Sequence, residues 1–154
     1  MANTITKINR ETKHEIAQSL QYALSDTFML YLKTHTYHWN VMGPQFLTLH
    51  QLFEEQYNEM WLAVDAMAER IRSIGEMAPH SQNLVEMATI PANLKVLTAK
   101  DMLKDLELGH EVVLKTLGAA LSYTNEAQDE ATAGMLTERI MIHEKHLWML
   151  KSSC

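Results

Sequence analysis

The chain has 154 residues, a length that allows one domain with a sizeable buried core, and 47% of its residues are hydrophobic. Its formal net charge of −6 argues against a surface that coats nucleic acid and is compatible with attracting cations. Because the only cysteine, Cys154, is the last residue and no apolar run approaches the ~20 residues of a membrane span, we expect a cytoplasmic protein without disulfides or membrane segments.

The polar start of the chain predicts a flexible tail over residues 1–9, followed by one helical domain over residues 10–151. The first helix is expected over residues 10–37, with Thr12 and Glu15 at the spacing of a capping box. Apolar and small residues recur along it at steps of three and four, which predicts the face that packs against the core. This inner face consists of Ile16, Leu20, Ala23, Thr27, Leu30 and Thr34.

A second helix is predicted after the Gly43-Pro44 break, over roughly thirty residues that end before Gly75. Its apolar stripe consists of Phe46, Leu49, Phe53, Tyr57, Met60, Val64, Met67, Ile71 and Ile74. One position further round lies a polar stripe with two pairs of ligand-type side chains at i,i+4 spacing and so on one face. These pairs are His50 with Glu54 and Asp65 with Glu69. Imidazole plus carboxylate is a ligand set that suits iron, and also zinc or manganese.

The two pairs are too far apart to share an ion within one chain. At ~1.5 Å rise per residue, Glu54 and Asp65 are separated by roughly 16 Å along the helix axis, yet both pairs face the same way. A second copy of the helix, laid antiparallel across a two-fold axis, would set His50 opposite Glu69. The same operation sets Glu54 opposite Asp65, so that two sites shared between chains form. The alternative is a solvated charged face, which Trp61 near its centre disfavours.

The connection between Gly75 and Thr98 is too long to be structureless in a compact domain. We expect a short helix over residues 81–88, capped by Ser81. A long crossover after the second helix is typical of a ferritin-like four-helix bundle. The sequence therefore predicts an all-α fold of this kind, with the short extra helix in the crossover.

The third helix is predicted from Thr98, with Asp101 in its first turn, to about Tyr123, and the fourth from about Gln128 to about Lys151. Their inner faces carry Leu103, Leu106, His110, Val113, Leu117 and Leu121, and Met135, Ile140, His143, Leu147 and Leu150. Several methionines fall on or beside core stripes, where methionine commonly fills gaps, so no haem is predicted. They are Met60, Met67, Met102 and Met135.

The order and spacing of these residues resemble the Dps family, the ferritin-like mini-ferritins of bacteria. The shared pattern is His38-Trp39-Asn40, Gly43-Pro44, Phe46, Leu49-His50, Phe53-Glu54, Asp65, Glu69-Arg70-Ile71 and Gly75, followed near the C-terminus by Asp129, Thr132, His143-Glu144 and Trp148-Met149-Leu150. The resemblance implies a homo-oligomeric dodecameric cage that oxidises ferrous iron at sites between two subunits and stores ferric oxide inside. The ligands it implies are His38, His50 and Glu54 of one chain with Asp65 and Glu69 of its mate.

The resemblance changes the interpretation of individual residues. His38 alone would be a helix-end histidine with a structural hydrogen bond, but within the motif it becomes an iron ligand. Trp39 is either a packing residue or, as the resemblance implies, a neighbour of the metal. Trp61 is expected to be buried by the partner chain beside the two-fold axis. The family often has a shorter aspartate at the position of Glu54, so Glu54 either ligates directly or holds a bridging water.

Other groups compete with this site. Glu107-x-x-His110 has the step used by di-iron sites within one chain, but the second and fourth helices lack matching steps, so His110 is better interpreted as a core histidine. His143 and His146, at i,i+3 spacing, could bind a stray metal, but a satisfied pair facing the bundle or a neighbour is the preferred interpretation.

Acidic residues Glu126, Asp129 and Glu130 open the fourth helix. They either meet the helix dipole favourably or, as the resemblance implies, line a three-fold pore that admits ferrous ions. The chain has Gly134 where the family commonly places an aspartate, which leaves the width and charge of such a pore open.

DNA binding, the named activity of the family's founders, is not expected here. In those members the resemblance implies a lysine-rich tail that reaches phosphates, whereas this tail and the following turn offer Lys7, Arg10 and Lys13. We predict a ferroxidase that stores iron and protects against oxidative stress, with peroxide or dioxygen as oxidant. The alternatives are a DNA-compacting or surface-interaction cage with minor iron chemistry, and a structural bundle without metal.

Overall fold

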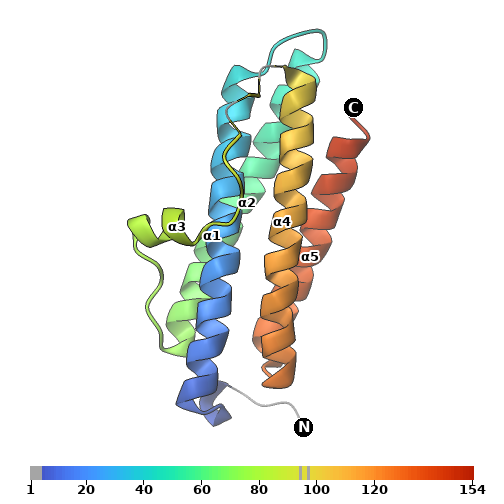
Figure 1. Ribbon diagram of the computed structural model, residues 1–154. Coiled ribbons are helices and arrows are strands. Elements are labelled where there is room, and N and C mark those ends of the chain that lie inside the picture. Colours follow the sequence, from blue (N-terminus) through green and yellow to red (C-terminus); the bar gives the residue numbers. More distant parts are fainter. Residues whose placement is uncertain (1–4, 94, 97) are drawn as a thin grey trace.

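The computed structural model describes residues 5–93, 95–96 and 98–154, and this part of the chain is all-helical. Four long helices form the bundle: α1 (Arg10–Asn40), α2 (Phe46–Ile74), α4 (Ala99–Glu126) and α5 (Glu130–Lys151). A crossover containing the short helix α3 (Ser81–Met87) carries the chain back along the bundle, so that α4 runs parallel to α2 (Figure 1). The predicted ferritin-like four-helix bundle with an extra crossover helix is confirmed.

The helix ends agree with the predicted turns but differ in their caps. Helix α1 begins one residue after Asn9, whose side chain accepts the backbone N–H of Thr12, so the predicted capping box of Thr12 and Glu15 is wrong. Asparagine is among the strongest N-caps, and Asn9 lies three residues before Thr12, which therefore falls inside the first turn of α1. Helix α2 ends at Ile74 and is capped by Gly75, whose φ of 106° places it in the left-handed region that favours glycine.

Part of the expected tail is packed against the bundle. Residues 5–7 form the 3-10 turn η1 (Ile5–Lys7), and Ile8 is buried in the core. Residues 1–4 lie outside the described part of the chain, and the division at residue 9 remains a prediction.

The crossover is tied to α1 by buried polar contacts. Asp26, which is fully buried, accepts the backbone N–H groups of Thr89 and Ile90 and the hydroxyl of Thr89. Helix α3 begins at Ser81, and His80 rather than Ser81 is its N-cap residue, without a side-chain cap. These contacts explain how a connection of this length stays close to the bundle.

The two C-terminal helices begin at side-chain caps. Thr98 and Asp101 form a reciprocal capping box at the start of α4, at the predicted position. Helix α5 begins at Glu130, two residues later than predicted, because Gln128 has a φ of 57° and Asp129 serves as the N-cap.

The core lies between the four helices and follows the predicted stripes closely. Met60, Met67 and Met102 are buried in it, as the gap-filling interpretation requires. The prediction for Phe46 is wrong, because this first residue of α2 is 43% exposed. Within the described residues, no helix is long and apolar enough to cross a membrane.

Candidate metal centre

His38 and His50 lie against each other where α1 ends and α2 begins. His38 Nδ1 is 2.8 Å from the backbone oxygen of His50, and His50 Nδ1 is 2.7 Å from the backbone oxygen of His38. The two rings are stacked, with centroids 3.7 Å apart and planes at 15°. The last turn of α1, the Gly43-Pro44 turn and the first turn of α2 together position both side chains.

This reciprocal bonding determines which ring nitrogen can bind a metal. A carbonyl oxygen only accepts, so each Nδ1 carries a hydrogen and donates it. Each ring then keeps its lone pair on Nε2, the arrangement in which a backbone carbonyl orients a metal-binding histidine. The sequence alone does not show which groups accept these hydrogens. The structure shows that they are the two backbone carbonyls.

The predicted carboxylate ligands are exposed along α2. Glu54, Asp65 and Glu69 all face solvent in the single chain. Among the described residues, they and the two histidines do not gather three ligand atoms within one chain. The helical rise that separates Glu54 from Asp65 explains this, because the two pairs lie about three turns apart. One chain therefore presents the predicted ligands as two separate groups.

Aromatic rings surround the histidine pair. Tyr57 stacks on His35 with centroids 3.9 Å apart and meets His38 edge-on at 5.1 Å. His35 also lies 4.7 Å from the ring of Trp39, which is itself 62% exposed. Burial, with His38 nearby as a second cause, lowers the pKa of His35. His35 was not among the predicted site residues, although its i,i+3 spacing from His38 places it on the same face of α1.

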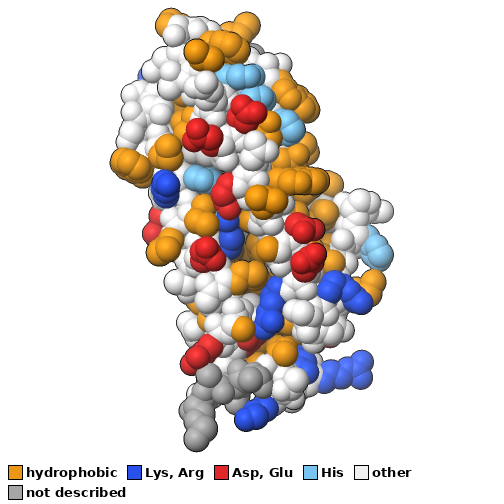
Figure 2. Space-filling model, turned by 180° about the vertical axis from the view of Figure 1, so that it is seen from behind, with side chains coloured by type: hydrophobic (Ala, Val, Ile, Leu, Met, Phe, Trp, Pro, Cys, Tyr) orange, Lys and Arg blue, Asp and Glu red, His pale blue; other side chains and the backbone are white. Residues whose placement is uncertain are grey.

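The exposed face of α2 also carries large apolar side chains. Trp61 is 55% exposed and contacts Tyr31 at a centroid distance of 5.3 Å, and its neighbour Leu62 is 70% exposed. Figure 2, which views the back of the bundle, shows hydrophobic side chains interspersed with carboxylates, with histidines gathered towards one end. An apolar stripe bordered by ligand-type carboxylates is typical of an interface rather than of a solvated helix face.

The three predicted pore residues differ in their surroundings. Asp129 is buried, caps α5 through Thr132 and forms an ion pair with Arg70 at 3.2 Å. Glu126 and Glu130 are exposed at the turn between α4 and α5. Asp129 therefore has a structural role in this chain, and the pore role of the other two remains a prediction.

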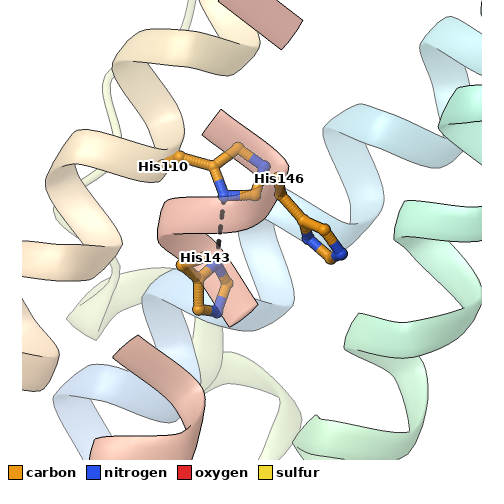
Figure 3. A group of neighbouring side chains, drawn as sticks. All are labelled: His110, His143 and His146. Atoms are coloured by element: carbon orange, nitrogen blue, oxygen red, sulfur yellow. Dashed lines mark hydrogen bonds between the residues drawn. The ribbon is translucent and has the colours of Figure 1, made fainter. Parts of the chain in front are cut away.

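A second histidine cluster lies between α4 and α5. His110, His143 and His146 are all buried, and their rings come together in the bundle core (Figure 3). His110 is a core histidine, as predicted, and the pair on α5 faces the bundle. The pair is not fully satisfied, however, because His146 Nδ1 has no partner among the described residues. The i,i+3 spacing on α5 was the available signal, but it could not show that His110 joins the pair.

Comparisons with known proteins identify the family to which this fold belongs. The Ferritin-like domain family matches residues 17–154. A DNA protection during starvation protein of Brevibacillus brevis is 37% identical over 139 residues, covering 89% of this chain and 93% of that protein. A Dps crystal structure from Bacillus brevis is 34% identical with a TM-score of 0.88, covering 94% of this chain and 98% of the other. A DPS protein from Vibrio cholerae, described as a member of a broad superfamily of ferritin-like diiron-carboxylate proteins, has a TM-score of 0.90 at 28% identity, covering 99% and 96%. The chain therefore belongs to the Dps family of ferritin-like proteins.

Proposed function

We propose that this protein oxidises ferrous iron and stores the ferric product inside a dodecameric homo-oligomer. The observation that carries the proposal is the reciprocal hydrogen bonding of His38 and His50, which leaves both Nε2 atoms as lone-pair donors. His50 lies one helical turn from Glu54 on α2. Two neutral imidazoles beside carboxylates form a donor set that suits iron.

The second half of each site is proposed to come from another chain. An antiparallel pairing of two α2 helices places Asp65 and Glu69 of the partner subunit opposite His50 and Glu54. The same pairing covers the exposed Trp61 near the two-fold axis. The solvent-facing apolar and acidic side chains of α2 are thus explained by one contact between two copies of the same helix.

Ferrous iron is the substrate at this site, and the protein holds two ions side by side. Carboxylates offset the positive charge of the ions, and the imidazoles supply neutral lone pairs. With peroxide as oxidant, each ferrous ion gives up one electron, the O–O bond breaks, and two protons complete two water molecules. Because both electrons are taken up together, no hydroxyl radical is released. Protection against oxidative stress would follow from this stoichiometry.

Entry and storage complete the proposal. The exposed Glu126 and Glu130 would line the path that admits ferrous ions, without the buried Asp129. Acidic groups of the cage interior would nucleate the ferric oxide, and we place the cage in the cytoplasm. The DNA protection in a relative's name is not proposed for this chain, because its net charge is −6 and its first thirteen residues hold only three basic side chains.

The experiment is an anaerobic ferrous titration followed by peroxide, with iron oxidation followed by near-ultraviolet absorbance. We expect two ferrous ions to be oxidised per peroxide consumed and a solution mass close to that of a dodecamer. If dioxygen oxidises the iron as fast as peroxide does, the proposal that peroxide is the oxidant is wrong. A monomeric or dimeric mass at physiological salt would contradict the cage.

A further inference from the structure

A group of ligand-type side chains lies wholly inside one chain, apart from the proposed iron site. His110 comes from α4, and His143 and His146 come from α5. His143 faces His110, and the ring of His146 lies to one side of this pair (Figure 3). One ring nitrogen of each lies within 4.8 Å of a ring nitrogen of the other two. Gly109, next to His110, supports this placement. A Cβ atom at this position would lie 2.6 Å from Leu30 Cδ1, so a glycine lets α4 approach α1 closely here.

Unpartnered polar atoms gather at this cluster. Within the described residues, five buried side-chain nitrogen or oxygen atoms have no hydrogen-bond partner, and His110 Nε2 and His146 Nδ1 are two of them. Two more are Arg139 Nε and Gln56 Oε1, on side chains that hydrogen-bond to His143 and to the backbone oxygen of His146. Buried polar atoms are nearly always paired, so this concentration points to a group that the cluster is built to hold.

The hydrogen bonds define where the protons lie in the metal-free protein. Arg139 can only donate, so His143 accepts at Nε2, 2.8 Å away, and carries its hydrogen on Nδ1. That Nδ1 donates to His110 Nδ1 at 3.0 Å, which places the hydrogen of His110 on its unpartnered Nε2. One proton therefore lies between two nitrogens whose separation is close to the roughly 3.3 Å between two ligands of a tetrahedral zinc ion.

We propose that His110, His143 and His146 form a Zn²⁺-binding site within each chain. The donor set is three imidazoles without a thiolate or a carboxylate, which suits zinc with a water molecule as the fourth ligand. Burial is the main cause that lowers the pKa of each of the three imidazoles, to about 4 for His146, so all three are neutral and can donate a lone pair. The adjacent Arg139 is paired with Glu59, so the ion meets no uncompensated cation.

Zinc binding requires one rearrangement that the geometry specifies. A metal ion bound to both Nδ1 atoms displaces the proton between them, and His143 must then carry its hydrogen on Nε2. Arg139 cannot accept this hydrogen, so its contact with His143 is broken, while its bonds to Glu59 remain available. Arg139 therefore opposes zinc binding, and removing its side chain strengthens it.

The first test measures Zn²⁺ binding by equilibrium dialysis in protein whose proposed iron ligands are disrupted by His50→Ala and Glu69→Ala. We expect one Zn²⁺ per chain to remain bound. X-ray absorption of the loaded protein should show imidazole nitrogens at about 2.0–2.1 Å as the majority of the ligands. Protein that retains no zinc, or zinc surrounded by oxygen alone, overturns the proposal and leaves water as the occupant of the cluster.

The second test uses two variants with opposite expected effects in the same background. His146→Gln should weaken zinc binding about 100-fold or more, because it removes a ligand. Arg139→Gln should strengthen it about tenfold, because the competing hydrogen bond to His143 is lost. Weaker binding in both variants would indicate damaged packing instead and would contradict the assigned role of Arg139. If His146→Gln does not fold, the absorption measurement on the intact triad decides. Neither test depends on iron oxidation, so the proposed function can fail independently.

Discussion

The two histidine clusters of this chain use the same side chain in opposite surroundings. His38 and His50 donate to backbone carbonyls, whereas His143 is held between the side chains of Arg139 and His110. A carbonyl cannot donate, so the first pair is fixed with Nε2 available. Either imidazole can donate in the bond between His143 and His110, so the second cluster can change tautomer once the contact with Arg139 is broken. In the two proposals, the first cluster is completed by another chain, whereas the second lies within one chain.

The largest effect should come from separating the halves of the first site. His50→Ala and Glu69→Ala should each reduce iron oxidation about 100-fold or more as homo-oligomers, because every shared site loses a ligand. When the two variants are reassembled together, a mixed pair has one doubly damaged site and one intact site, so activity should partly return. Stopped-flow oxidation after subunit exchange measures this. A mixture as inactive as its parents, despite proven exchange, would place all ligands in one chain.

The second cluster should make the metal-free protein sensitive to acid. Between pH 6.5 and about 4, His146 is neutral when folded but becomes protonated when unfolded, so the unfolded state binds more protons and stability falls as pH falls. The loss from His146 alone should reach about 3 kcal/mol near pH 4 and level off below it. Urea unfolding with a chelator present measures this. Burial is the main cause of the lowered pKa of His146. Glu59 opposes it by raising the pKa, and Arg139 and Lys145 lower the pKa further. An unchanged free energy of unfolding across this range would contradict burial of a neutral ring.

A smaller effect is expected from a substitution that weakens the contact between chains without changing a predicted iron ligand. Trp61→Ala removes an exposed aromatic side chain that we place beside the two-fold axis, which should weaken the dimer by about 2 kcal/mol. Iron oxidation should fall with it, although no ligand is changed. Analytical ultracentrifugation and oxidation rates are measured on the same samples. Val85→Ala, at an equally exposed position on α3, is the control and should leave both unchanged.

The smallest effect concerns how Glu54 acts. Glu54→Asp keeps the charge and should change ferrous affinity by less than about tenfold, because a bridging water can span the shorter side chain. Glu54→Gln removes the charge and should weaken binding more. Isothermal titration under anaerobic conditions compares the two variants. If the aspartate variant is the weaker binder, Glu54 ligates directly.

The sequence was sufficient for features that depend on one helix. The shared face of the predicted ligand pairs on α2 and its core stripe follow from helical periodicity. The end of α2 was predicted from Gly75, which serves as its C-cap. Features that depend on how helices meet could not be predicted. Spacing showed that His143 and His146 share a face, but only the packing of α4 against α5 brings His110 to them. Asp129 was expected either to meet the helix dipole or to line a pore, and only the packing shows that it is buried against Arg70 as the N-cap of α5.

The two histidine clusters also differ in how far apart their hydrogen-bonded residues lie in the sequence. The two histidines are 12 residues apart in sequence, whereas His110 and His143 are 33 apart. Loop-closure entropy grows with the logarithm of that separation, so closing the first contact costs about 0.9 kcal/mol less. The first pair therefore belongs to a single helical hairpin, whose ligand geometry can be set before α4 and α5 have docked. A substitution that loosens those two helices should slow formation of the second cluster while the hairpin keeps its histidines in register.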